Sequence, residues 1–264
     1  MISDFKLITH HFDSDINIIP ISDVHLGARE HMNMAWQKFC EKVVNEPNTY
    51  IVLVGDLLNN GVKDSVTNVY NEVYMPSEAK RIMTSMLKPI AKAGKILAVT
   101  SGNHERRNSA YDNDITYDIC TCLDIEHLYR ENACFIKLQF GEKNGNGAKN
   151  PTYVLCVTHG SGGGAMYGST VNRKTNFAYA IDGLDALITG HDHKPFDVFP
   201  SKIKIDPHNN NVIMKHFVVM SASSWLEYGD YALRGMLKPS ASIGQTMVFH
   251  RNEKRIDMIN SLQF

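Results

Sequence analysis

The sequence predicts an α/β protein with four layers (α+β), in which two mixed β-sheets pack face to face and α-helices flank them. Short apolar, β-branched runs alternate with segments of helical period in the first half of the chain. Beyond Leu128 the pattern changes to alternating strands, which favours largely antiparallel sheet. The 264 residues, 43% hydrophobic and 21% charged, suffice for one domain with a substantial core.

Five apolar runs in the first part of the chain predict buried strands, and two segments between them have helical spacing. The first predicted helix is Met32–Asn45. The second, Ser77–Ala93, begins after a proline and ends before Gly94, as helices commonly do. Strand, helix and strand therefore alternate twice. The predicted strands are Asn17–Ser22, Tyr50–Val54, Lys95–Thr100, Tyr153–Thr158 and Ala186–Thr189.

The second half adds strands that are joined by polar turns. Gly141–Pro151 reads as a Gly/Asn-rich hairpin or loop and Asp206–Asn211 as a turn, and neither is long enough to link two domains. We expect a single domain over residues 1–264, with a motif core at about 16–195 and a β-rich completion at about 196–264. The predicted strands are Cys134–Gln139, Lys202–Ile205, Val212–Ser221, Gln245–His250 and Arg255–Ile259.

Composition limits the setting of the protein. The formal charge of −1 provides no sequence-wide positive field for nucleic acid or an anionic membrane. The five cysteines are scattered, and the spacing of Cys120 and Cys122 is not that of a redox or zinc motif, so buried thiols in a reducing compartment are expected. No leader and no apolar run of about 18 residues is present, which predicts a cytoplasmic protein without a membrane partner.

Residues suited to metal ions follow each of the five strands in the first part of the chain. Because strands of an α/β sheet present their carboxyl ends at one edge, we expect these side chains to meet in one cleft. An aspartate after a strand is often a cap and a single histidine often structural, but neither explains the histidine pairs. The candidate ligands are Asp23, His25, Asp56, Asn103, His159, His191 and His193.

The chemistry of these ligands favours two first-row ions. Two carboxylates, one amide and four imidazoles suit Mn²⁺ first, with iron, zinc, cobalt or nickel as alternatives, whereas Mg²⁺ or Ca²⁺ prefers oxygen ligands. A structural zinc needs only four ligands. Seven ligands suit two ions roughly 3.5–4 Å apart, an arrangement that clamps both oxygens in phosphoryl hydrolysis.

Five sequence blocks resemble, in full and in order, the signature of the calcineurin-like metallophosphoesterases. They are D-x-H (Asp23–His25), G-D (Gly55–Asp56), G-N-H-E (Gly102–Glu105), H-G (His159–Gly160) and G-H-D-H (Gly190–His193). The resemblance implies the metallophosphoesterase fold and a binuclear phosphoric ester hydrolase. Single blocks are weak signals, but five after successive strands are highly specific.

The resemblance also implies a role for each candidate ligand. Asp56 would bridge the ions, a bridging hydroxide would attack phosphorus, and His104 would protonate the leaving oxygen or stabilise the transition state. The first metal would be bound by Asp23, His25, Asp56 and His193, and the second by Asp56, Asn103, His159 and His191.

Four neighbours of the ligand blocks have two interpretations each. Glu105 and Asp192 would orient imidazoles or face solvent. Arg106 and Arg107 would grip a substrate phosphate or form ordinary surface ion pairs.

The run HGSGGGAMYGS that starts at His159 contains too many glycines for a regular element. It predicts an anion-binding loop or a lid, although it lacks the ending of a P-loop. Arg173 and Lys174 beyond it would line the entrance.

The distal stretch SASSWLEYGDYALRGMLKPSASIG is similar to the tail of metallophosphoesterases that bacteriophages often encode, which would place the protein in a host cytoplasm. Trp225, Tyr228 and Tyr231 would either stack on a base or belong to the core.

Substrate class follows only from departures within the family. Asn59 stands where the Mre11-type DNA nucleases carry a histidine, which counts against that role. The block GDLLNNG lacks the arginine that the protein phosphatases carry there, which counts against a dedicated protein phosphatase. We predict a phosphodiesterase acting on nucleic acid or a nucleotide. The alternatives are a phosphomonoesterase and a non-catalytic metal-binding scaffold or nucleic-acid-processing subunit. The resemblance also allows a homodimer formed through sheet edges.

Overall fold

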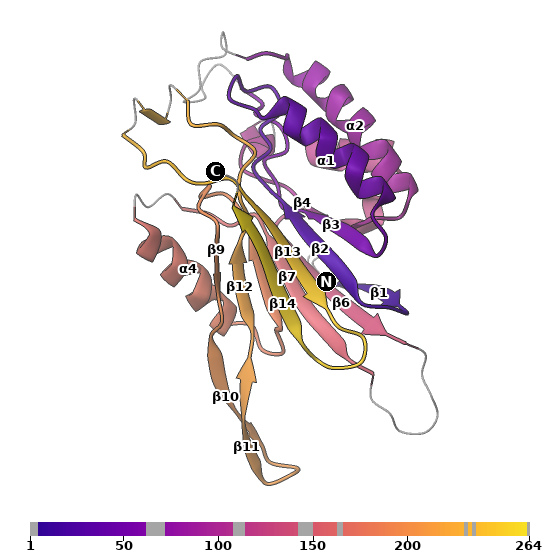
Figure 1. Cartoon of the computed structure of the whole chain (residues 1–264), viewed down its shortest axis with the longest axis vertical. Coiled ribbons are helices and arrows are strands. Elements are labelled where there is room, and N and C mark those ends of the chain that lie inside the picture. The colour runs from indigo at the N-terminus through magenta and orange to yellow at the C-terminus, as the bar shows by residue number, and fades with distance from the viewer. Residues whose placement is uncertain are drawn as a thin grey trace.

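The computed structural model describes residues 5–61, 72–107, 114–141, 150–162, 166–229, 232–233 and 236–262. Two six-stranded sheets pack against each other, and helices cover the outer face of each, so the four-layer α/β prediction is confirmed (Figure 1). No helix in these segments is long and apolar enough to cross a membrane.

Sheet I has the strand order β14-β13-β2-β3-β4-β5. Its central strands are parallel and almost wholly buried, as their continuous Ile, Val and Leu runs require. The last two strands of the chain pair antiparallel at one edge. The strands are β2 (Ile16–Ile21), β3 (Thr49–Leu53), β4 (Ile96–Thr100), β5 (Tyr129–Arg130), β13 (Ile243–Phe249) and β14 (Ile256–Leu262).

Sheet II has the order β1-β6-β7-β8-β12-β9 and mixes parallel with antiparallel pairs. A core cluster between the sheets contains residues of both, such as Ile18 and Val52 from sheet I and Ile136 and Met220 from sheet II. The strands are β1 (Leu7–Phe12), β6 (Ala133–Phe140), β7 (Thr152–Thr158), β8 (Ala186–Thr189), β9 (Phe196–Val198) and β12 (Val218–Ser221).

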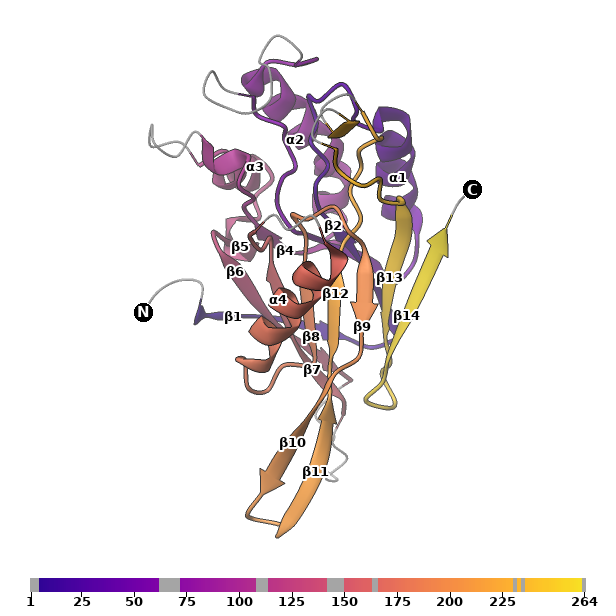
Figure 2. The same cartoon turned by 90° about the vertical axis from the view of Figure 1, so that its left-hand side faces the viewer.

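The helices form the outer layers. In α2 the buried residues Ala79, Met83, Leu87 and Ile90 recur at helical spacing, and its first residue is a proline, whose missing N–H costs nothing there. On the other side of the molecule, α4 covers sheet II over a second apolar cluster (Figure 2). The helices are α1 (Asn33–Asn45), α2 (Pro76–Lys92), α3 (Ile115–Cys122), the 3₁₀ turn η4 (Glu126–Leu128) and α4 (Tyr167–Tyr179).

A two-stranded arm extends beyond sheet II. It consists of β10 (Ser201–Asp206) and β11 (Asn211–His216), and it projects from the body as the continuation of β9 and β12 (Figure 1). The pairing register runs unbroken along this hairpin, from Ser221 opposite Phe196 to Asp206 opposite Asn211. One hydrogen bond, from Phe217 N to Pro200 O, joins the two parts.

Several local predictions require correction. The predicted strand Val212–Ser221 is two strands, because the sheet changes at Phe217. The glycine run was expected to contain no regular element, yet α4 begins within it at Tyr167. Cys120 is buried as expected, whereas Cys122 is exposed. Most of Gly141–Pro151 lies outside the described residues.

Candidate metal centre

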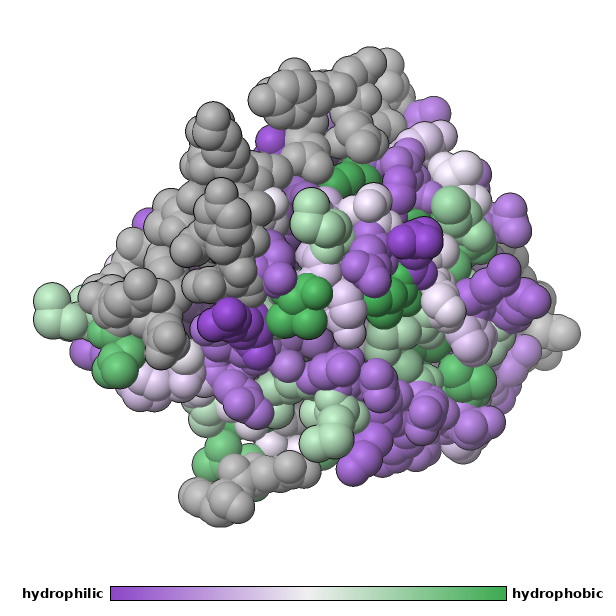
Figure 3. All heavy atoms as spheres, turned by 90° about the horizontal axis from the view of Figure 1, so that it is seen from above, coloured by the Kyte–Doolittle hydropathy of each residue, from purple (hydrophilic) through white to green (hydrophobic). Residues whose placement is uncertain are grey.

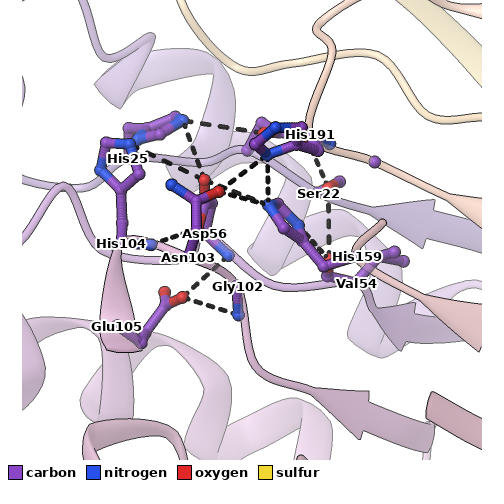
Figure 4. A network of polar contacts seen from close by, with 12 residues as sticks. Ser22, His25, Val54, Asp56, Gly102, Asn103, His104, Glu105, His159 and His191 are labelled. Carbon is purple, nitrogen blue, oxygen red and sulfur yellow. Dashed lines mark hydrogen bonds and ion pairs between the residues drawn. The ribbon is translucent and has the colours of Figure 1, made fainter. Parts of the chain in front are cut away.

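All seven candidate ligands meet between the carboxyl ends of both sheets. Figure 4 shows His25, Asp56, Asn103, His159 and His191 turned toward one another. Asp23 and His25 follow β2, Asp56 follows β3 and Asn103 follows β4, all in sheet I. The remaining histidines follow β7 and β8 in sheet II. The expectation of a single sheet edge is therefore wrong, although the predicted convergence of the side chains holds.

The backbone is strained at most of these positions. Five candidate ligands have left-handed φ values, a region that costs energy for a residue other than glycine but that Asp, Asn and His tolerate best. Such φ values turn consecutive side chains sharply at a strand end, which lets D-x-H and H-D-H deliver two ligands each. The residues are Asp23 (53°), His25 (49°), Asp56 (51°), His191 (75°) and His193 (52°).

Two glycines are required by close approach to the aspartates. A Cβ at Gly102 would lie 2.0 Å from Asp56 Oδ1, and one at Gly190 would lie 1.8 Å from Ser22 Oγ and 2.9 Å from Asp23 Oδ2. The glycines of G-N-H-E and G-H-D-H therefore let the backbone touch the carboxylates directly.

A first set of ligand atoms surrounds Asp23 Oδ1. His193 Nε2 lies 3.0 Å from this oxygen and 3.2 Å from His25 Nε2. His25 Nε2 lies 3.8 Å from Asp23 Oδ1 and 3.8 Å from Asp56 Oδ2. The other oxygen of Asp23 accepts hydrogen bonds from Ser22 Oγ and the backbone N–H of His191, so only Oδ1 faces the set.

A second set surrounds His159 Nε2. This nitrogen lies 3.2 Å from Asp56 Oδ2, 3.1 Å from Asn103 Oδ1 and 3.2 Å from His191 Nδ1. His159 donates its other ring N–H to the carbonyl of Val54 at 2.7 Å, which directs Nε2 toward the other atoms of this set. Asp56 Oδ1 accepts the N–H of His104 at 2.8 Å, so its Oδ2 alone belongs to both sets.

The two sets have the spacing that divalent ions require. Ligand atoms about 2.0–2.2 Å from one ion, at tetrahedral or octahedral angles, lie about 2.8–3.6 Å apart. The neighbouring ligand atoms here lie 2.7–3.8 Å apart, which departs from this range by no more than about 0.2 Å. Divalent metal ions therefore fit this centre, and the carboxylate, amide and imidazole mixture suits first-row ions.

Charge pairing within the centre shifts the pKa of its members. Burial alone would raise the pKa of Asp56, but the hydrogen bond and charge of His159 outweigh burial and lower it. Burial would also raise the pKa of Asp23, but the charge and hydrogen bond of His193 lower it well below its usual range. Burial disfavours the charged form of His159, but Asp56 raises its pKa to about 9.

His104 stands beside the shared carboxylate with a fixed tautomer. Its Nδ1–H donates to the Asn59 carbonyl at 2.7 Å, so its Nε2 accepts a hydrogen bond from Arg107 Nη2 at 2.8 Å. That Nε2 lies 3.8 Å from Asp56 Oδ2. Burial, followed by the charge of His25, lowers the pKa of His104 to about 3, so the ring is neutral here.

The two arginines lie in different environments. Arg107 also donates to the Asn59 carbonyl at 3.0 Å, so it borders the centre. Arg106 points elsewhere, because its Nη2 donates to the carbonyls of Glu131 at 2.9 Å and Ser101 at 3.3 Å.

Glu105 has neither of its two expected roles. It is 1% exposed, and its carboxylate accepts three backbone N–H groups at 3.0 Å, from Asp56, Leu58 and Gly102. Glu105 therefore fixes the loop that carries Asp56, and it neither orients an imidazole nor faces solvent. Burial, and next the charge of Asp56, raises the pKa of Glu105 to about 7.

Lys174 supports the G-H-D-H loop from behind, a role that the sequence did not reveal. This side chain is 4% exposed, so the expectation that it lines an entrance is wrong. Its Nζ donates to Gly190 O at 2.7 Å and Ser221 Oγ at 2.8 Å, and pairs with Asp192 Oδ2 at 2.9 Å. Asp192 therefore binds a buried cation instead of facing solvent. Arg173 is exposed and donates to Ser161 O at 2.9 Å.

The aromatic residues of the distal stretch split between core and surface. The Trp225 ring packs against Trp36 and Phe39 with centroids 5.2 Å apart, as a core residue does. Tyr228 is exposed and donates its hydroxyl to Leu237 O at 2.7 Å. Tyr231 lies outside the described residues.

Comparisons with solved structures found distant similarity. A predicted phosphoesterase from Streptococcus pneumoniae TIGR4 is 9% identical, with 95% of this chain and 100% of that chain covered and a TM-score of 0.38. A cold-active protein-tyrosine phosphatase of a psychrophilic Shewanella species is 13% identical, with 98% and 81% covered and a TM-score of 0.39. Among curated proteins the search found no match.

A model of the calcineurin-like phosphoesterase family matches residues 16–195, more than half of the chain. The matched segment includes all the candidate ligands and His104. The family hydrolyses phosphate esters with divalent metal ions, in agreement with the donor set found here. This chain therefore belongs to the calcineurin-like phosphoesterases, and it is a metal-dependent phosphoester hydrolase.

Proposed function

We propose that the protein is a phosphodiesterase with a two-metal centre, Mn²⁺ being the first choice, and that it acts on a nucleic acid or a nucleotide. The observation that carries the proposal is the pair of ligand sets that share Asp56 Oδ2. One set comprises Asp23, His25, Asp56 and His193, and the other Asp56, Asn103, His159 and His191. When bound, two divalent ions activate water and neutralise phosphate oxygens.

His104 and Arg107 supply the remaining chemistry. With Nδ1–H held by Asn59, His104 offers Nε2 to the leaving oxygen. A bound phosphate draws the Arg107 guanidinium away from Nε2 and adds negative charge, which raises the pKa of His104 and lets Nε2 carry the transferred proton.

The charge of the side chains beside the ligand sets favours a phosphodiester substrate over a phosphomonoester. Among the described residues, one guanidinium, Arg107, and one neutral imidazole, His104, stand beside the ligand sets, and they match a phosphate group with a single negative charge. The side chain of Asn59 donates a hydrogen bond to Glu72, and as an amide it cannot act as an acid in place of a histidine.

The test is Mn²⁺-dependent hydrolysis of bis-p-nitrophenyl phosphate and p-nitrophenyl phosphate by the native protein, Asp56→Asn and His104→Ala. We expect diester turnover to exceed monoester turnover and to be lost in Asp56→Asn. Preference for the monoester would indicate a phosphomonoesterase, and no metal-dependent turnover of either would indicate a scaffold.

His104 has a sharper test in the leaving group. If Nε2 protonates the leaving oxygen, His104→Ala lowers kcat by about 10²–10⁴-fold for a diester with a poor leaving group, such as a simple alcohol. The loss is much smaller for p-nitrophenolate, which needs no proton. Equal losses for both would show that His104 stabilises charge and transfers no proton.

A further inference from the structure

The arm presents an apolar face that no described part of the chain covers. Antiparallel partners share one side of a ribbon, so the pairs Ile203–Met214 and Ile205–Val212 lie on the same face. These four side chains are 68%, 56%, 71% and 64% exposed, and Phe199 at the base of the arm is 63% exposed. Natural edge ribbons seldom leave such a face bare.

This face continues one that is buried in the body. In the same unbroken register, Val218 and Met220 lie on that side of β12, and both belong to the core between the two sheets. Phe217 and Val219 lie on the other side, in the cluster that α4 covers. The arm therefore repeats the pattern of a strand whose apolar face packs on a second sheet, beyond the point where sheet I ends (Figure 2).

The opposite face of the arm is polar and attached to the body. Lys202 pairs with Asp182 at 3.1 Å, and Lys215 approaches Asp185 at 3.7 Å. Lys204, Asp206 and Asn211 lie on the same face, together with one apolar residue, Ile213. These contacts lie on the polar side of the base of the arm and leave the apolar side outward.

We propose that the apolar face of the arm binds the same face of a second copy of this chain, sheet on sheet, in a two-fold dimer. The face from Phe199 to His216 contains no carboxylate, lysine or arginine, so it has no charge to match an acidic or basic partner. Where this face continues on β12 in the body, the apolar surface of sheet I covers it. In a two-fold dimer the same apolar face of the second copy would cover the arm.

The exposed apolar area of the arm is large enough for a stable dimer. Large side chains present about 150–200 Å² when free, so five that are about two-thirds exposed offer roughly 500–700 Å² per copy. The pair then buries roughly 1,000 Å² or more in total, about the minimum for a specific interface. The arm points away from the carboxyl end of β12, next to which the centre lies, so the paired face does not include the centre (Figure 1). In the view from above, the residues drawn in colour are mainly hydrophilic, with apolar side chains scattered among them (Figure 3).

The experiment is sedimentation of the full chain over about 1–100 µM, with Ile205→Lys on the apolar face and Ile213→Lys as the matched control. Ile213 is the same residue type in the same hairpin, but it lies on the polar face opposite Lys204. Val212→Lys repeats the test from the other strand. Thermal unfolding and metal-dependent turnover verify that each variant is folded.

We expect a dimer for the native chain and for Ile213→Lys, and a dimer dissociation constant raised at least about tenfold in Ile205→Lys and Val212→Lys. Unchanged turnover in all variants is expected, because the arm lies away from the centre. A native chain that is monomeric throughout the range overturns the proposal and leaves the face for a different protein. So does a dimer that Ile205→Lys and Val212→Lys leave intact.

Discussion

Asp56 occupies the position on which both ligand sets depend. Its φ of 51° turns the carboxylate into the space between the sheets, and the N–H of His104 holds one oxygen at 2.8 Å. Glu105 accepts its backbone N–H at 3.0 Å. The shared ligand is therefore fixed by the chain itself, so we expect the centre to be largely formed before any metal arrives.

The raised pKa of His159 makes metal binding depend on pH. A metal needs the bare Nε2 of His159, but Asp56 keeps this ring protonated up to about pH 9 in the metal-free protein. Below pH 9 binding must release a proton, so affinity rises about tenfold per pH unit and levels off above pH 9. Calorimetric Mn²⁺ titrations at pH 7, 8 and 9, in buffers of different ionisation enthalpy, measure both effects. Affinity that is constant over this range would contradict the assignment.

Arg107 and Arg106 are adjacent in sequence, yet we expect opposite phenotypes. Arg107→Ala removes the guanidinium beside His104, which should raise KM and lower kcat for diesters, together about 10²-fold in kcat/KM. Arg106→Ala is the control, because its guanidinium binds the Ser101 and Glu131 carbonyls and its loss should lower stability while sparing kcat. Steady-state kinetics and urea unfolding separate the two effects. Equal kinetic losses would place both arginines at the substrate.

The identities of the proposed ligands are readable from sequence, but the roles of their neighbours are not. Motifs such as D-x-H and G-N-H that directly follow a strand place ligand residues at the strand end, however the surrounding side chains pack. Whether Glu105 meets an imidazole or a backbone N–H depends on how β3 and β4 turn at their ends, which local sequence does not encode. The same holds for Arg106 and Arg107, whose directions are set by tertiary partners.

At the scale of elements, α4 supports the metal centre through Lys174. Replacing it by methionine leaves the Asp192 carboxylate buried without its cation, which we expect to cost about 3–5 kcal/mol of unfolding free energy. Asp192→Asn added to Lys174→Met should recover much of this loss. Denaturant unfolding measures it, and Lys202→Met is the control, since its partner Asp182 is 93% exposed and little change is expected. A small loss in Lys174→Met would mean that water reaches Asp192.

Long buried strands were predictable from the sequence, and short or polar elements were not. β2, β3, β4, β7 and β8 lie within about one residue of their predicted bounds because apolar runs fix them. α4 was not predicted because its buried face contains Thr170 and Lys174, so its sequence lacks a clear helical repeat of apolar residues. α3 carried a usable signal in Asp114, whose side chain accepts the N–H of Tyr117 as a helix cap.

At the scale of the whole molecule, the ligand sets join the two sheets. Because the proposed metal ligands are drawn from both sheets, bound ions would stabilise the folded state alone. At a hundredfold excess over Kd, one ion adds about 2.7 kcal/mol, which shifts Tm by roughly 5–10 °C for a chain of this size. Thermal scans with Mn²⁺ and with a chelator test this, and Asp56→Asn should lose most of the shift. An unchanged Tm would mean that the ions do not join the sheets.

The arm and the metal centre lie at opposite ends of the β9–β12 strand pair, whose pairing register continues into the arm. β9 begins three residues after His193, and β12 ends at Ser221, which binds the lysine that holds Gly190. Thermodynamic reciprocity then applies between the two ends: if engagement of the arm strengthens metal binding by some factor, metal binding must strengthen engagement of the arm by the same factor. The dissociation constant of the dimer, measured with and without Mn²⁺, therefore measures any coupling between the arm and the centre.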